Sequence, residues 1–217
     1  MSTAPRLAKP RLRGVSHQWG FFVSIAAGAV LIALAPHGRA TTAAAIYAAA
    51  VSALLGTSTL YHRIDWRPAA RRWVRRLDRS MIYVLIAASY TPFALLALHG
   101  ALATVVLAVV WSGAGGGVAL QLLWPDHPKW VAVLVSIALG WVAVITLTQL
   151  PHTIGWWAIG ALVLSGVLYT AGAVIYARER PNPRPGVFGY HELFHAFVLA
   201  AAAIHYAVVA FFVLPLG

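Results

Sequence analysis

The chain has 217 residues, of which 61% are hydrophobic and only 10% are charged. Soluble globular domains carry about 25% charged residues, so this composition excludes an ordinary soluble enzyme. The apolar content also excludes an intrinsically disordered chain. The formal net charge is +11, and the absence of cysteine excludes disulfides, cysteine metal sites and thiol nucleophiles. The nine histidines are therefore the main candidates for chemistry.

Seven apolar runs, separated by polar, proline or glycine breaks, follow one another along the chain. Each is close to the ~20 residues that a membrane-spanning helix needs, and none alternates as a barrel strand does. The predicted spans are 19–35, 41–62, 78–98, 101–124, 130–150, 154–177 and 191–214. We therefore expect an all-α polytopic membrane protein, with a basic cytoplasmic leader over residues 1–18 and a single seven-helix transmembrane domain over residues 19–214.

The first apolar run also resembles a secretory signal peptide. A basic leader precedes it, and it ends in Ala33-Leu34-Ala35, which is typical of a cleavage site. Pro36 at the next position disfavours cleavage, so we interpret the run as the first span.

The positive charges are distributed very unequally between the two sides of the predicted bundle. Of the 16 lysines and arginines, 15 lie in the leader or in loops on the side of the leader, and only Arg39 lies on the other side. This bias predicts a cytoplasmic N-terminus and an external C-terminus. The charge therefore indicates membrane topology and attraction to anionic lipids, not nucleic-acid binding.

The loop between the second and third spans contains an amphipathic pattern. Trp66, Trp73 and Leu77 recur at helical spacing, and arginines occupy the opposite side. This pattern is typical of a helix that lies at the lipid headgroups. A solvated basic loop is the alternative interpretation.

Several polar residues share one depth near the cytoplasmic face. His62 ends the second span, Asp78 begins the third, and His191 and His195 begin the seventh. His191 and His195 are four residues apart and lie on one helical face, and Ser58 has the same relation to His62. Three imidazoles with an open fourth position are typical of catalytic zinc, so we predict that His62, His191 and His195 bind zinc. Asp78 and Ser58 are the candidate catalytic residues beside it.

The segment His191-Glu192-Leu193-Phe194-His195 also matches the His-Glu-x-x-His motif of zinc proteases, in which the glutamate is the general base. No acidic residue follows His195, so the third ligand would have to come from upstream. Two other histidines belong to the predicted spans or lie directly beside them. His17 precedes the first span and is a further candidate for approach to the site, whereas His205, buried at mid-membrane, is expected to be a hydrogen-bonded interior residue.

Taken together, the ordered motifs resemble the hemolysin III family, bacterial relatives of the progestin and adipoQ receptors in a superfamily that includes alkaline ceramidases. The resemblance covers about residues 11–210. The stretches that carry it are Arg13–His17, Ser58–His62, Leu77–Ser80, Ser89–Phe93, Leu168–Gly172 with Tyr176, and His191–His195 with His205-Tyr206.

The resemblance implies seven helices with a cytoplasmic N-terminus and a zinc ion held by His62, His191 and His195. It assigns Asp78 to the aspartate that holds water at the metal and Ser58 to the family's serine, and it argues against a catalytic role for Glu192. Many relatives carry histidine after the aspartate, whereas this chain has Arg79. We interpret Arg79 either as a ligand for a lipid phosphate or as a cation that acts electrostatically on Asp78.

Three classes of function follow from these residues. The first is a zinc-dependent hydrolase that cleaves a ceramide-like lipid amide. The second is a non-enzymatic sensor, receptor or membrane-homeostasis protein with structural zinc, or, from the family name, a cytolytic pore. The third is an intramembrane protease. The expected location is the plasma membrane, as in a bacterial inner membrane, and the expected partners are membrane lipids and a lipid substrate, with no nucleic acid. The sequence assigns no oligomeric state.

Overall fold

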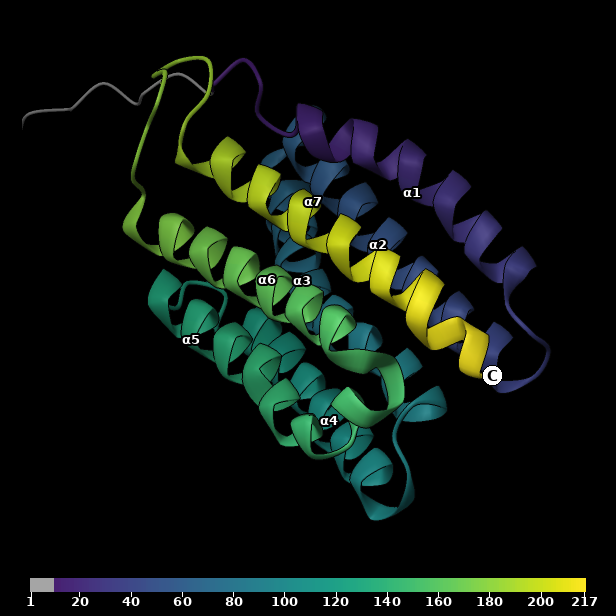
Figure 1. Ribbon diagram of the computed structural model, residues 1–217. Coiled ribbons are helices and arrows are strands. Elements are labelled where there is room, and N and C mark those ends of the chain that lie inside the picture. The colour runs from purple at the N-terminus through teal and green to yellow at the C-terminus, as the bar shows by residue number, and fades with distance from the viewer. Residues whose placement is uncertain (1–9) are drawn as a thin grey trace, which may run out of the picture.

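The computed structural model describes residues 10–217, and within them seven long helices run alternately up and down (Figure 1). All seven are long and apolar enough to cross a membrane when the fifth is taken over Lys129–Thr148 and the seventh over Tyr190–Leu216. In lipid each helix satisfies its own backbone hydrogen bonds. Their bounds are α1 Val15–Leu34, α2 Arg39–Arg63, α3 Pro68–Leu96, α4 Gly100–Leu123, α5 Lys129–Gly140, α6 Leu150–Arg178 and α7 Tyr190–Val208. The prediction of an all-α bundle of seven helices is confirmed.

The two ends of the bundle differ in charge. At one end α1, α3, α5 and α7 begin and α2, α4 and α6 end. We call this the basic end because all the lysines and arginines of residues 10–217 except Arg39 lie there. The C-terminus lies at the opposite end, beside the turn between α1 and α2 (Figure 1). Seven is an odd number of passes, which places the start of α1 and the C-terminus at opposite ends.

All seven helices begin before the predicted spans, and the differences at α1 and α3 change the interpretation of the sequence. Val15 is the first residue of α1, so residues 15–18 of the predicted leader are helical. The amphipathic segment after Arg67 is the first part of α3, which continues without interruption from Pro68 to Leu96. The interpretation of this segment as a helix is confirmed and that of a solvated loop is wrong, whereas its position at the lipid headgroups stays a prediction.

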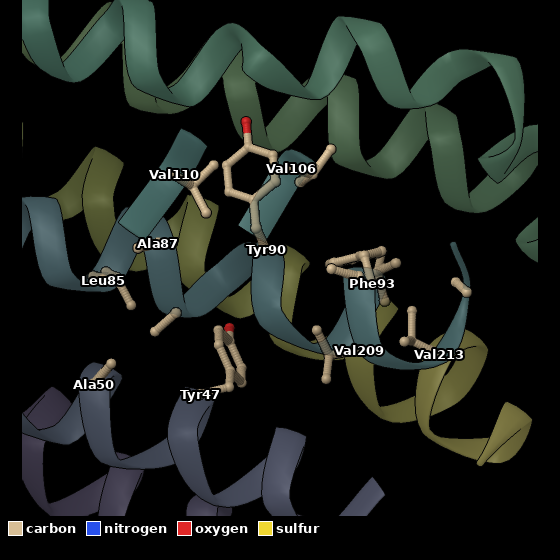
Figure 2. Close-up of a cluster of buried hydrophobic side chains, with 14 of the residues drawn as sticks. Tyr47, Ala50, Leu85, Ala87, Tyr90, Phe93, Val106, Val110, Val209 and Val213 are labelled. Carbon is tan, nitrogen blue, oxygen red and sulfur yellow. The ribbon is translucent and has the colours of Figure 1, made fainter. Parts of the chain in front are cut away.

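The fifth predicted span is not one regular α-helix. α5 ends at Gly140 and continues as a 3₁₀-helix over Trp141–Thr148. The Tyr90 hydroxyl of α3 lies at this junction, where it donates to the carbonyls of Leu139 and Gly140 and accepts from the backbone N–H of Ala143 at 2.8 Å. Figure 2 shows this hydroxyl directed away from Tyr47, toward the neighbouring helices. Tyr90 therefore satisfies backbone groups that the change of helix type exposes.

Close packing between helices depends on small residues, as is typical in lipid. A Cβ atom on Gly28 of α1 would lie 2.9 Å from the Cβ of Ala48 of α2, and one on Gly113 of α4 would lie 2.6 Å from Leu139. The core itself joins α2, α3, α4 and the C-terminal part of the chain through apolar side chains (Figure 2). This packing holds α2, α3 and α7 in the register that forms the site.

Candidate metal centre

The three predicted metal ligands come together at the basic end of the bundle. His62 lies in the last turn of α2, and His191 and His195 lie one turn apart in the first turns of α7. One ring nitrogen from each of the three lies within 4.8 Å of the others. The Nε2 atoms of His62 and His191 are 3.1 Å apart, and the rings of His191 and His195 have centroids 4.6 Å apart. A three-histidine group that can bind a metal ion is therefore present.

Burial separates this group from bulk water. His62 and His195 are buried and His191 is half-buried. The Nδ1 atom of His195 is buried without a hydrogen-bond partner among the described residues. A buried polar atom without a partner is unfavourable unless something else satisfies it. The His195 imidazole therefore has a ring nitrogen available for a further ligand.

Ser58 and Asp78 lie beside the histidines. Ser58 is one helical turn before His62 on α2 and is buried, and Asp78 reaches the same cavity from α3. The Ser58 and Asp78 side chains are neighbours. The structure thus places both candidate catalytic residues next to the three-histidine group.

His17 of α1 is the fourth imidazole at this site. Its ring stacks on that of His195, and its Nδ1 atom lies 2.8 Å from the Ser58 Oγ in a hydrogen bond. The sequence contained only one signal for this role, which was the position of His17 at the basic end. Its pairing with Ser58 and His195 depends on how α1 packs against α2 and α7.

The segment before α1 is tied to the loop between α6 and α7. The backbone N–H groups of Arg11 and Leu12 donate to the carbonyls of Gly186 and Val187, at 3.0 and 3.2 Å. These bonds place Arg13 beside α7, where its guanidinium forms an ion pair with Glu192. The start of α1 and the start of α7 are therefore joined at the site.

Glu192 is engaged by this ion pair and does not face the histidines. Its side chain is 2% exposed, it accepts from Arg13, and its second oxygen accepts from the backbone N–H of Gly189 at 2.8 Å. Glu192 is also absent from the residues that line the cavity beside the histidines. This arrangement caps α7 and does not suit the general base of a zinc protease.

A cavity of about 460 Å³ leads from the histidines into the bundle. Its walls come mainly from α3, α5, α6 and α7, and its lining is largely apolar and aromatic. It extends past Tyr90 and Trp141 to His205, whose Nε2 atom lies 3.2 Å from the Ser89 carbonyl. The prediction that His205 is a hydrogen-bonded interior residue is confirmed. Cavities of this volume and character accommodate apolar ligands.

Comparison with known proteins assigns the chain to a family. The model of the "Haemolysin-III related" family matches residues 6–206. The chain belongs to this family. Among its relatives is Hemolysin-3 of Bacillus cereus, which is 32% identical over 204 residues, a match that covers 93% of this chain and 90% of the relative.

Animal proteins are also related to this haemolysin-III-related chain. The human monocyte to macrophage differentiation factor is 30% identical over 166 residues, covering 74% of this chain and 66% of the relative. The adiponectin receptor protein of Drosophila melanogaster is 38% identical over 80 residues, covering 35% of this chain and 16% of the relative. The predicted kinship with both hemolysin III proteins and the adipoQ receptors is confirmed.

Proposed function

We propose that the chain is a zinc-dependent hydrolase of lipid amides, embedded in the plasma membrane. The observation that carries the proposal is the position of the three-histidine group. It lies beside Asp78 and Ser58 at one end of an apolar cavity of about 460 Å³. A site for polar chemistry and a volume for an acyl chain therefore adjoin one another.

The histidines present fit zinc. Two nitrogens bound at 2.0–2.1 Å to one tetrahedral ion lie about 3.3 Å apart, close to the 3.1 Å between the His62 and His191 Nε2 atoms. Imidazole is a preferred ligand for zinc. When bound by three protein ligands, zinc acts as a Lewis acid and lowers the pKa of a coordinated water to about 7.

The protein side chains supply the proton transfers and the positioning. In amide hydrolysis a hydroxyl from water adds to the acyl carbon, the C–N bond breaks, and a proton goes to the leaving amine. Asp78 accepts the proton from water and donates it to the amine nitrogen. Ser58, held by His17, orients the water or donates to the developing oxyanion. The acyl chain lies in the cavity.

Fatty-acid release from fluorescent lipid amides and esters tests this proposal. We expect purified wild type to release fatty acid and Asp78→Asn to be slower by about 100-fold or more, as for loss of a general acid–base residue. His37→Ala is the control, because His37 is exposed at the opposite end of the bundle. Equal rates for wild type and Asp78→Asn on all substrates would reject the hydrolase.

The separation of the histidines in the chain supports a second candidate, a receptor or sensor with structural zinc. His62 and His191 lie 129 residues apart, on α2 and α7, so a shared ion would fasten these two helices together. In that case metal removal would lower thermal stability while no lipid is turned over. Measuring both quantities on the same preparation separates the two functions.

The proposed orientation places the basic end in the cytoplasm. The leader and the loop between α6 and α7 pair through backbone hydrogen bonds, so they lie on one side of the membrane. Both segments are basic, as the positive-inside rule expects of cytoplasmic segments.

A further inference from the structure

A second pocket, of about 470 Å³, opens at the basic end, beside the cavity described above. It is formed by the start of α3, the turn between α4 and α5, and the end of α6. Its charged or ionisable lining residues are Arg75, Arg79, Asp126, His127, Lys129 and Glu179. Unlike the cavity beside the three histidines, which we call the metal cavity, this pocket has charged or ionisable side chains at six of its ten lining positions.

The charges in this pocket are arranged with the carboxylates outermost. Asp126 pairs with Arg75 at 3.0 Å and its side chain is 82% exposed, whereas that of Arg75 is 30% exposed. Glu179 pairs with Lys129 at 2.7 Å, with exposures of 55% and 33%. The positive groups therefore lie deeper in the protein than the negative groups, so an anion that enters passes the carboxylates and meets the cations.

Of the three cations that line the pocket, Arg79 is the one that forms no ion pair with a carboxylate among residues 10–217. Its Nη1 atom donates to the Pro125 carbonyl at 3.4 Å, a long contact that leaves most of its donors available. A guanidinium offers five N–H donors in a planar fork that matches phosphate oxygens. The pocket thus contains a half-buried arginine with capacity for a phosphate.

His127 provides an independent indication that a ligand binds here. The residue is 5% exposed, its Nδ1 atom lies 3.0 Å from the Pro128 carbonyl, and its Nε2 atom is buried with no partner among the described residues. With Nδ1–H donating to Pro128, the Nε2 atom of the neutral ring carries a lone pair and accepts a hydrogen bond. Leaving such a buried atom unsatisfied is unfavourable, and the P–OH of a phosphate monoester or a headgroup hydroxyl in the pocket would satisfy it.

Two of the cations connect this pocket with the metal cavity. Arg79 and Lys129 line both. Arg79 also follows Asp78 in the chain and interacts with it electrostatically, and the Lys129 ammonium lies over the ring of Tyr176, 5.0 Å from its centroid, on the wall of the cavity. A molecule with an anionic head and an apolar tail can therefore occupy both spaces at once.

We propose that this pocket binds the phosphate of a phosphate-bearing lipid whose chain lies in the metal cavity. Arg79, Lys129 and His127 contact the phosphate. This proposal deepens the proposed function, on which it rests, by naming the substrate class as lipid amides that carry a phosphate headgroup. Arg79 gives this protein a cation suited to that headgroup.

The test measures binding of two ether lipids that differ only in the phosphate, 1-O-hexadecyl-glycerol 3-phosphate and 1-O-hexadecyl-glycerol. Neither has an acyl bond, so binding is independent of hydrolysis, and failure of the hydrolase proposal would leave this result unaffected. We expect the wild type in detergent to bind the phosphate lipid at least tenfold more tightly by native mass spectrometry. Inorganic phosphate at the same concentration, as competitor, should displace little of it.

Variants distinguish binding of the phosphate lipid in this pocket from general attraction of an anionic lipid to the basic surface. Arg79→Gln and His127→Gln should lose most of the preference for the phosphate lipid, and Arg79→Lys should keep part of it. Arg72→Gln is the matched control, because Arg72 is exposed on the same helix and lines neither cavity. Equal binding of the two lipids by wild type, an equal loss in Arg72→Gln, or full competition by inorganic phosphate would overturn the proposal.

Discussion

The imidazole of His17 stacks on that of His195, with ring centroids 3.7 Å apart and planes 10° from parallel. The same imidazole is hydrogen-bonded to Ser58. His17 therefore connects a member of the three-histidine group with a candidate catalytic residue, and α1 becomes part of the site. The first span is needed for the site as well as for the bundle.

His17→Phe separates these two contacts. Phenylalanine keeps a planar ring against His195 but removes the hydrogen bond to Ser58. We expect the metal content to be unchanged and hydrolysis to fall by about 10- to 100-fold, the usual cost of removing a residue that orients a metal site. Metal analysis and rate measurement on one preparation test this. An unchanged rate in His17→Phe would show that Ser58 does not depend on His17.

Removing any one of the three histidines should remove the metal. We expect about one zinc per chain in wild type by mass spectrometry, and little in His62→Ala, His191→Ala or His195→Ala, because two imidazoles leave the ion under-coordinated. His37→Ala, exposed at the opposite end, should keep the wild-type content. Full zinc occupancy in all three site variants would show that the metal binds elsewhere.

Gly14 controls the position of His62. It has a φ of +80°, and a Cβ atom there would lie 2.5 Å from the His62 Cβ. Gly14→Ala should therefore displace His62 and weaken metal binding by about tenfold or more. Gly38→Ala is a matched control, because Gly38 has a φ of +77° with nothing within 4 Å of the added atom. Both variants strain the backbone through a positive φ, and Gly38, with a ψ of −120° against −1° for Gly14, carries at least as much strain. Only Gly14→Ala should change metal affinity.

Replacing either member of the Arg13–Glu192 ion pair should lower the stability of the bundle, and replacing Arg13 should lower it more. Arg13→Met leaves the buried Glu192 carboxylate without its partner and should cost about 3 kcal/mol, toward the lower end for a buried pair because Arg13 is 19% exposed. Glu192→Gln should cost less, because glutamine can still accept from the Gly189 N–H. Thermal unfolding in detergent measures both, and the double variant should recover part of the loss.

The same variant distinguishes a lipid hydrolase from a protease. Glu192→Gln should retain its metal and its lipid hydrolysis, since Glu192 caps α7 and does not line the cavity. A protease that used Glu192 as general base would lose its activity in this variant and keep it in Asp78→Asn. That pattern would contradict the role of Asp78 as the general acid–base residue and of Glu192 as the cap of α7.

Reporter fusions test the orientation of the bundle. Alkaline phosphatase fused after Gly217 should be active, and green fluorescent protein fused there should not fluoresce, because we place the C-terminus outside. Reporters inserted in the loop between α6 and α7 should give the opposite pattern. A C-terminus in the cytoplasm would reverse the orientation, and the metal centre would then lie at the outer face.

Local pattern was sufficient to determine the helices and part of the site. Each apolar run long enough to cross a membrane forms a helix, since no other open structure satisfies the backbone in lipid. The spacing of His191 and His195 placed both on one face of α7, and the depth of His62 followed from its position at the end of an apolar run. These features depend on neighbouring residues in the chain, so the sequence contains them.

The tertiary structure decided the remaining features. Arg13 and Glu192 are 179 residues apart and His17 and Ser58 are 41 apart, and no periodicity specifies which helices bring such pairs together. The break of α5 at Gly140 depends on the hydroxyl of Tyr90 from another helix. Nothing in the local pattern indicates that His127 is buried, or that Arg79 and Lys129 line two cavities at once. Helix formation in lipid is local, whereas cavities and buried polar pairs arise only when the helices pack.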